Sequence, residues 1–166
     1  MKLGHICCSL GHRLIYEDML EKGFNQVLIF EDDVLVLREK ESLLPEILQQ
    51  IPSDAEMIYW GWGGLEKPPL QASLKKAIYH IQHSIGLLKY NHTMIKNLYP
   101  KLYNEHFRIA GKQFCTQAYT ITRSGAEKLI ECQTPVAFNA DVALTHLILN
   151  GILKAYIVIP PLFSQG

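Results

Sequence analysis

Three consecutive acidic residues, Glu31, Asp32 and Asp33, separate two apolar runs within the segment Val27–Leu37. Adjacent carboxylates repel one another, and partial burial increases that cost. A divalent cation would relieve the repulsion, and carboxylate oxygens are ligands that suit Mg²⁺ or Mn²⁺. The segment therefore indicates a metal site, although an acidic cluster between strands is also typical of a solvated turn.

The apolar runs on either side of the acids, Gln26–Phe30 and Val34–Leu37, are short and rich in residues that favour strands. Because they are continuously apolar rather than alternating, they predict buried strands covered on both faces, as in α/β proteins. In an open α/β sheet, ligands bind at the carboxyl ends of the strands. The acids are therefore expected at the edge of a sheet where a ligand can reach them.

The remaining chain alternates segments of helical and of strand character. Apolar spacing predicts helices over 10–22 (with Ser9 as N-cap), 39–50, 72–88, 125–134 and 141–149. Apolar runs predict strands over 56–60, 113–121 and 153–159. The inward face of the first helix is expected to comprise Leu10, Leu14, Ile15, Met19 and Leu20. Segment 90–109 lacks clear periodicity and is typical of a functional loop.

Length and composition indicate one globular domain spanning residues 1–166, with 48% apolar and 19% charged residues. Lys+Arg and Asp+Glu both number 16, so the net charge of zero argues against non-specific binding to nucleic acid or anionic membranes. The four cysteines include no Cys-x-x-Cys pair, which favours reduced, mostly buried thiols. With no signal peptide and no apolar run of the ~20 residues needed to span a membrane, a cytoplasmic location is expected.

Several segments, taken in order, match the motifs of one known family. They are Gly4–His12, an imperfect match to Gly-x-x-Gly-Cys-x-x-Ser-His; Ile29–Val34, with its Glu-Asp-Asp; Ala118–Leu129; Pro135–Val136 followed by Asp141; and Pro160–Gln165. Together they resemble glycosyltransferase family 25, which includes bacterial lipooligosaccharide galactosyltransferases and procollagen galactosyltransferases. The resemblance extends over nearly the whole chain.

The resemblance implies an α/β fold: a single nucleotide-diphospho-sugar transferase domain of GT-A type, with a mixed sheet flanked by helices. Glu31 and Asp33 would flank a Mn²⁺ or Mg²⁺ ion that bridges the diphosphate of a UDP-sugar, and Asp32 would orient the metal or the donor ribose. Gln165 is expected to contact the metal or a phosphate. His12 has two readings, a phosphate or ligand contact and a packing hydrogen bond.

The family's activity implies transfer of a sugar, expected to be galactose, to a saccharide acceptor with inversion, as in lipopolysaccharide biosynthesis. The acceptor can lie at a membrane surface. A single displacement needs a base that takes the proton of the acceptor hydroxyl. Asp141 is the candidate base, and the competing reading makes it the N-cap of the helix that follows.

Family members usually begin with an additional strand and helix that carry much of the nucleotide pocket, whereas this sequence starts at Gly4–Cys8. The resemblance thus implies a domain truncated at the N-terminus, with an open sheet edge at the first strand. A second copy of the chain could cover that edge, which makes a homo-oligomer one expectation. The alternative to an enzyme is a catalytically degenerate relative that binds a glycan or a protein.

Overall fold

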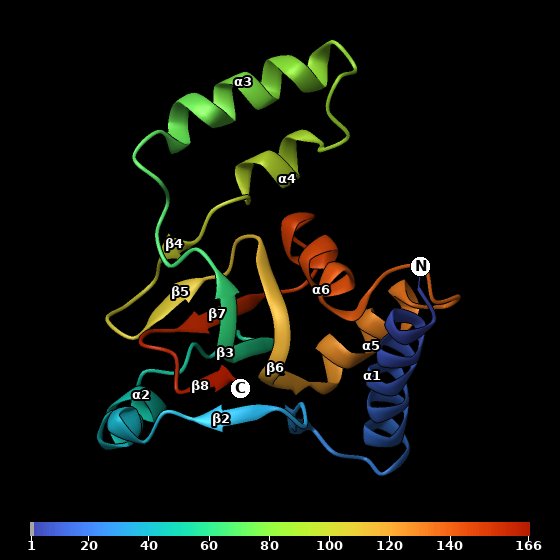
Figure 1. Ribbon diagram of the computed structural model, residues 1–166, viewed down its shortest axis with the longest axis vertical. Coiled ribbons are helices and arrows are strands. Elements are labelled where there is room, and N and C mark those ends of the chain that lie inside the picture. Colours follow the sequence, from blue (N-terminus) through green and yellow to red (C-terminus); the bar gives the residue numbers. More distant parts are fainter. Residues whose placement is uncertain (1) are drawn as a thin grey trace.

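The computed structural model describes residues 2–166 and has a mixed sheet at its centre (Figure 1). The sheet strands are β1 (Gln26–Phe30), β3 (Met57–Gly64), β4 (Lys101–Leu102), β5 (Phe107–Ile109), β6 (Gln113–Thr122) and β7 (Ala155–Val158). Their spatial order is β1-β6-β3-β7-β5-β4, and β3 and β7 run parallel while the other neighbours are antiparallel. A separate ribbon pairs β2 (Val34–Val36) with β8 (Phe163–Gln165). The mixed sheet confirms the α/β fold.

Helices cover both faces of this sheet. One face packs against α1 (Leu3–Glu21), α5 (Arg123–Cys132) and α6 (Ala140–Leu149), which lie together in Figure 1. The buried side chains at this face include Tyr16, Met19, Tyr59, Tyr119, Leu129, Leu144 and Ile157. The opposite face packs against η1 (Arg38–Leu43) and α2 (Leu44–Gln49) around Ile47, Ile58, Trp60 and Val158. The pair α3 (Ala72–Ser84) and α4 (His92–Lys96) lies beyond one end of the sheet.

The two strands that flank the acids are not buried on both faces, so that prediction is wrong. β1 lies at the edge of the sheet, where Leu28 is 50% and Phe30 is 46% exposed. β2 belongs to the two-stranded ribbon, and its Leu35 and Val36 are also exposed. The doubly covered strands are instead β3, β6 and β7, which occupy the middle of the sheet.

The inward face predicted for α1 is also largely wrong. The helix begins at Leu3 rather than after Ser9, and Leu10, Leu14 and Ile15 are exposed. Ser9 is buried inside the helix because its hydroxyl finds acceptors, the carbonyls of His5 at 2.8 Å and Phe138 at 3.0 Å. Polar side chains that find partners in the interior, rather than the apolar ones, thus set the orientation of α1.

Smaller differences concern element boundaries and cysteines. The predicted helix 39–50 is a 3₁₀ turn followed by α2, with Pro45 in the first turn of α2, and segment 90–109 contains α4, β4 and β5. Helix α5 is capped by Thr122, which accepts from the backbone of Gly125. All four cysteines are free, but Cys7 and Cys8 are exposed rather than buried. Within residues 2–166, no helix combines the length and apolar character needed to cross a bilayer.

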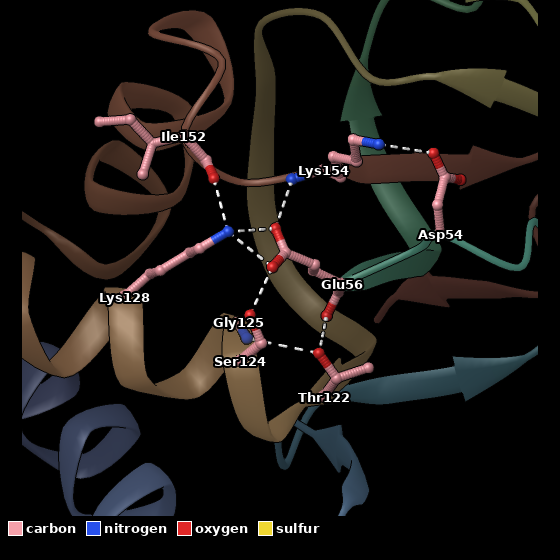
Figure 2. A network of polar contacts seen from close by, with 8 residues as sticks. All are labelled: Asp54, Glu56, Thr122, Ser124, Gly125, Lys128, Ile152 and Lys154. Atoms are coloured by element: carbon pink, nitrogen blue, oxygen red, sulfur yellow. Dashed lines mark hydrogen bonds and ion pairs between the residues drawn. The ribbon is translucent and has the colours of Figure 1, made fainter.

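Glu56, directly before β3, connects three elements through its hydrogen bonds (Figure 2). Its carboxylate accepts hydrogen bonds from Ser124 and Lys128 of α5 and from the backbone N–H of Lys154 beside β7. Its backbone carbonyl accepts from the N–H of Thr122 at 2.9 Å. Burial raises the pKa of Glu56, but the hydrogen bonds from Lys128 and Ser124 outweigh burial and hold it below its ordinary value. The carboxylate therefore ties β3 to α5 and β7 in its ionised form.

We expect Glu56→Gln to lower the free energy of unfolding at pH 7 by about 1.5–3 kcal/mol, the range for hydrogen bonds to a charged group. Because the folded-state pKa is depressed, the stabilisation is present above the ordinary pKa of 4.5 and is lost as the pH falls through the lower folded value. Urea denaturation at pH 7 and pH 3 should therefore show a smaller difference from wild type at pH 3. Glu127→Gln, at a surface ion pair on the same helix, is the control and should change stability by less than ~0.5 kcal/mol. An equal loss in both variants would contradict this role.

Candidate active site

Two of the three consecutive acids are held by residues far away in the sequence. Glu31 follows β1 and is half-buried, and its carboxylate accepts a hydrogen bond from the hydroxyl of Thr116 in β6. Asp33 is exposed, and its carboxylate accepts from the side-chain amide of Gln165 at 2.7 Å. Asp32 is exposed as well. The chain turn between β1 and β2 thus sends Glu31 inward and Asp33 toward the C-terminal ribbon.

A cavity of about 260 Å³ is lined by Glu31, Asp141 and Gln165. These residues come from the end of β1, the first turn of α6 and β8, so the fold brings Glu31 together with two predicted site residues that lie more than 100 positions later in the sequence. Asp33 approaches the same place through its hydrogen bond to Gln165. His12 and Asp32 are not among the lining residues.

Negative charge converges on one point of this cavity, the thiol of Cys115. Burial raises the pKa of that thiol, and the carboxylates of Asp141, Glu31 and Asp33 raise it further. Cys115 also has a φ of 68°, a conformation that a non-glycine residue rarely adopts. Three carboxylates that act on one half-buried thiol form a local concentration of negative charge, which suits a cation.

Asp141 is not the N-cap of α6, so that reading is wrong. The N-cap position is held by Asn139, whose side chain makes no capping hydrogen bond. Asp141 lies in the first turn, where the partial positive charge of the helix end favours a carboxylate. Asn139 lines the cavity too, and its Oδ1 is buried without a hydrogen-bond partner. A hydrogen-bond donor of a ligand, or a cation, would give this unpaired acceptor the partner that it lacks.

His12 makes the packing hydrogen bond and also faces the acids. Its Nδ1 lies 2.7 Å from the hydroxyl of Tyr119, which lies 2.6 Å from the hydroxyl of Tyr16. Its Nε2 lies 3.5 Å from Glu31 Oε1. Burial lowers the pKa of His12, and the nearby Glu31 opposes that shift. Tyr119 lies in the core, and its hydroxyl orients His12.

Cys8 is a residue that the sequence analysis did not select. It lies one helical turn before His12 on α1, lines the cavity, and has a thiol pKa raised by burial and then by Glu31. The i, i+4 spacing of Cys8 and His12 was the available signal, since residues four apart share a helix face.

The oxygen ligands predicted for a metal fit the site in part. Among the described residues, Glu31, Asp32 and Asp33 do not bring three ligand atoms within 4.8 Å of one another, whereas Cys8, His12 and Glu31 do. The unpaired Asn139 Oδ1 and the carboxylates around Cys115 are the features that suit Mn²⁺ or Mg²⁺.

We call the cavity lined by Glu31, Asp141 and Gln165 the acidic cavity, and an aromatic surface lies near it. Asp141 also lines an adjoining cavity of about 200 Å³, which shares Tyr90, Lys112 and Phe114 with a third cavity of about 470 Å³. We call the surface formed by Tyr79, Tyr90, Tyr99, Lys112 and Phe114 the aromatic trough. Asp141 therefore lies at the junction between the acidic cavity and the aromatic trough. Tyr90 begins the segment that the sequence marked as a functional loop, but nothing in the sequence identified Lys112 or Phe114.

Comparison with known proteins found a match over residues 1–144 to the model of a family described as "Glycosyltransferase family 25 (LPS biosynthesis protein)". The chain is 23% identical over 130 residues to the "Probable inactive glycosyltransferase 25 family member 3" of Bos taurus. It is 25% identical over 130 residues to the "Inactive glycosyltransferase 25 family member 3" of Homo sapiens. Each alignment covers 78% of this chain but 18% of the relative, so the matched part of the chain spans less than a fifth of the length of these relatives.

Proposed function

The chain belongs to glycosyltransferase family 25, and on that premise we propose that it is a metal-dependent enzyme that transfers galactose from a UDP-sugar to a saccharide acceptor with inversion. The observation that carries this proposal is the position of Asp141 between an acidic cavity and an aromatic trough. A transferase needs two adjoining subsites, one for the donor and one for the acceptor, with a base between them.

In the proposed donor subsite, Glu31 and Asp33 hold a Mn²⁺ or Mg²⁺ ion, and Gln165 positions Asp33 through the hydrogen bond at 2.7 Å. The bound ion would supply a Lewis acid that stabilises the negative charge of the leaving diphosphate. Thr116 fixes the Glu31 carboxylate from β6. Asp32, exposed beside them, is proposed to contact the donor ribose or the metal, and His12 a phosphate.

In the proposed acceptor subsite, the apolar faces of sugar rings pack against Tyr90 and Phe114, as amphipathic ligands commonly do on aromatic side chains. The acceptor hydroxyl then reaches Asp141. As its oxygen bonds to the anomeric carbon, the bond from that carbon to the diphosphate oxygen breaks, and the proton passes to the Asp141 carboxylate. Attack opposite the leaving group inverts the configuration at the anomeric carbon.

The description of the matching family as an LPS biosynthesis protein supports a lipopolysaccharide precursor as acceptor, located in the cytoplasm or at its membrane surface. The alternative function is a catalytically degenerate relative that binds a glycan or a protein partner. The observation that favours it is that both curated relatives are named inactive. The two functions differ in whether the acids bind a cation together with a nucleotide.

Binding of UDP with Mn²⁺ should raise the melting temperature of the protein. At about ten times its dissociation constant, a ligand adds about 1.4 kcal/mol to the stability of the native state, or roughly 3–6 °C for a domain of this size. Glu31→Gln and Asp33→Ala should lose the shift, whereas the control Asp18→Ala, on the exposed side of α1, should keep it. A differential scanning fluorimetry experiment in which UDP shifts the wild type equally with Mn²⁺ and with excess chelator would contradict the metal-dependent donor site.

Substitution of the proposed base should slow the reaction without weakening donor binding. We expect Asp141→Asn to lower kcat by about 10²-fold or more, the usual contribution of general base catalysis. The KM of the UDP-sugar should stay within a few-fold, because Glu31 and Asp33, and not Asp141, are the proposed ligands of the donor's cation. Steady-state transfer assays in which the UDP-sugar is varied at saturating acceptor measure both constants. A kcat within twofold of wild type would exclude Asp141 as the base.

We further propose that two copies of the chain associate through the open edge of β1. Light scattering at micromolar concentration should then give about twice the monomer mass of 18.9 kDa. Leu28→Lys, which places a charge on this edge, should restore the monomer, whereas Leu74→Lys on the exposed face of α3 should not. A monomeric wild type would contradict the association.

A further inference from the structure

Cys8, His12 and Glu31 form a cluster of potential metal ligands that differs in chemistry from the carboxylates considered above. One ligand atom of each residue lies within 4.8 Å of the others. Cys8 and His12 are four residues apart on α1 and thus share a face of the helix, while Glu31 comes from the end of β1. Two secondary-structure elements therefore bring a sulfur, a nitrogen and an oxygen to one point.

We propose that Cys8, His12 and Glu31 bind a thiophilic divalent cation, with Zn²⁺ as the ion that suits them best. Zn²⁺ accepts sulfur, nitrogen and carboxylate oxygen in one site, whereas Mn²⁺ and Mg²⁺ favour oxygen ligands. His12 and Glu31 alone are two potential ligands, with His12 Nε2 and Glu31 Oε1 3.5 Å apart. The thiol of Cys8 beside them completes a set of three protein ligands.

The cluster is supported by a second layer of hydrogen bonds. His12 is 7% exposed, and its Nδ1 lies 2.7 Å from the Tyr119 hydroxyl. With Nε2 free to ligate, Nδ1–H donates to Tyr119, and the Tyr119 hydroxyl in turn donates to the oxygen of Tyr16 at 2.6 Å. Thr116 holds Glu31 by a hydrogen bond to its carboxylate. Partners of this kind fix the orientation of ligands in metal sites.

Three protein ligands leave a fourth position of a tetrahedral ion open. Cys8 and Glu31 both line the acidic cavity, so a water molecule or a polar group of a small ligand can reach the ion from that side. The cluster also shares Glu31 with the proposed donor subsite. Zn²⁺ would therefore withdraw Glu31 from the donor's cation and inhibit transfer; this consequence rests on the proposed function, whereas the metal site itself does not.

Titration with Co²⁺ tests the site because a thiolate–cobalt bond gives a charge-transfer band in the near ultraviolet. We expect the band to saturate at one Co²⁺ per chain and to disappear when one equivalent of Zn²⁺ is added. Cys8→Ser should abolish it, and Cys7→Ser should keep it. Cys7 is the matched control, since it is the adjacent cysteine and is also exposed. No band at millimolar Co²⁺, or equal loss in both variants, would overturn the proposal.

A second variant, Tyr119→Phe, tests whether the hydrogen bond to His12 strengthens metal binding in a folded protein. Tyr119→Phe keeps the buried ring but removes the hydroxyl that orients His12, and we expect the affinity for Co²⁺ to fall by about 10–100-fold. Thermal melts of Cys8→Ser and Tyr119→Phe verify that both variants are folded. Asp33→Ala should retain the band, because Asp33 is not a ligand of this site. If the wild type shows the Co²⁺ band but does not bind UDP or Mn²⁺, the donor subsite is refuted and the Cys8–His12–Glu31 site is not. An unchanged affinity in folded Tyr119→Phe would overturn the proposed role of its hydroxyl.

Discussion

The half-buried carboxylate of Glu31 is the group on which the architecture of the site depends. It follows the edge strand β1 and accepts a hydrogen bond from the Thr116 hydroxyl of β6. Its Oε1 lies 3.5 Å from Nε2 of His12 in α1. An anion in this position must be compensated, because desolvation penalises an unpaired charge. Ser9 and His12 of α1 also lie inward, because each finds hydrogen-bond partners in the interior. His12, Tyr119 and Tyr16 thus form one chain of hydrogen bonds, in which each buried polar side chain has a partner.

The features that could be predicted from the sequence are those encoded by local pattern. The strand β6 and helix α6 differ by at most one residue from their predicted ranges, because long apolar segments with a clear period specify them. The inward face of α1 could not be predicted in this way. Its exposed Leu10 and Leu14 and its buried Ser9 reverse the usual rule, since the partners of Ser9 and His12 lie in distant segments. The burial of β1 and β2 was overestimated because a run of apolar residues does not reveal whether a strand lies at an edge.

The residues of the candidate site, too, could be predicted from the sequence only in part. The sequence selected Glu31, Asp141 and Gln165 by resemblance and by residue type, and the fold places them around one cavity. Their roles remain predictions. Cys8 was not selected as a site residue although its spacing to His12 was a signal, whereas nothing in the sequence marked Lys112 or Phe114, which gain their role from their place beside α6. The chain belongs to glycosyltransferase family 25, and the names of the two relatives from Bos taurus and Homo sapiens include the word inactive.

We propose above all that Glu31 and Asp33, beside the acidic cavity, hold a cation through which a nucleoside diphosphate binds. Equilibrium dialysis of Mn²⁺ with and without UDP tests it directly. Because coupling between two ligands is reciprocal, UDP should raise the affinity for Mn²⁺ by the same factor by which Mn²⁺ raises the affinity for UDP, and Asp33→Ala should remove both effects. Affinity for Mn²⁺ that does not change with UDP, or that survives the substitution, would contradict the account.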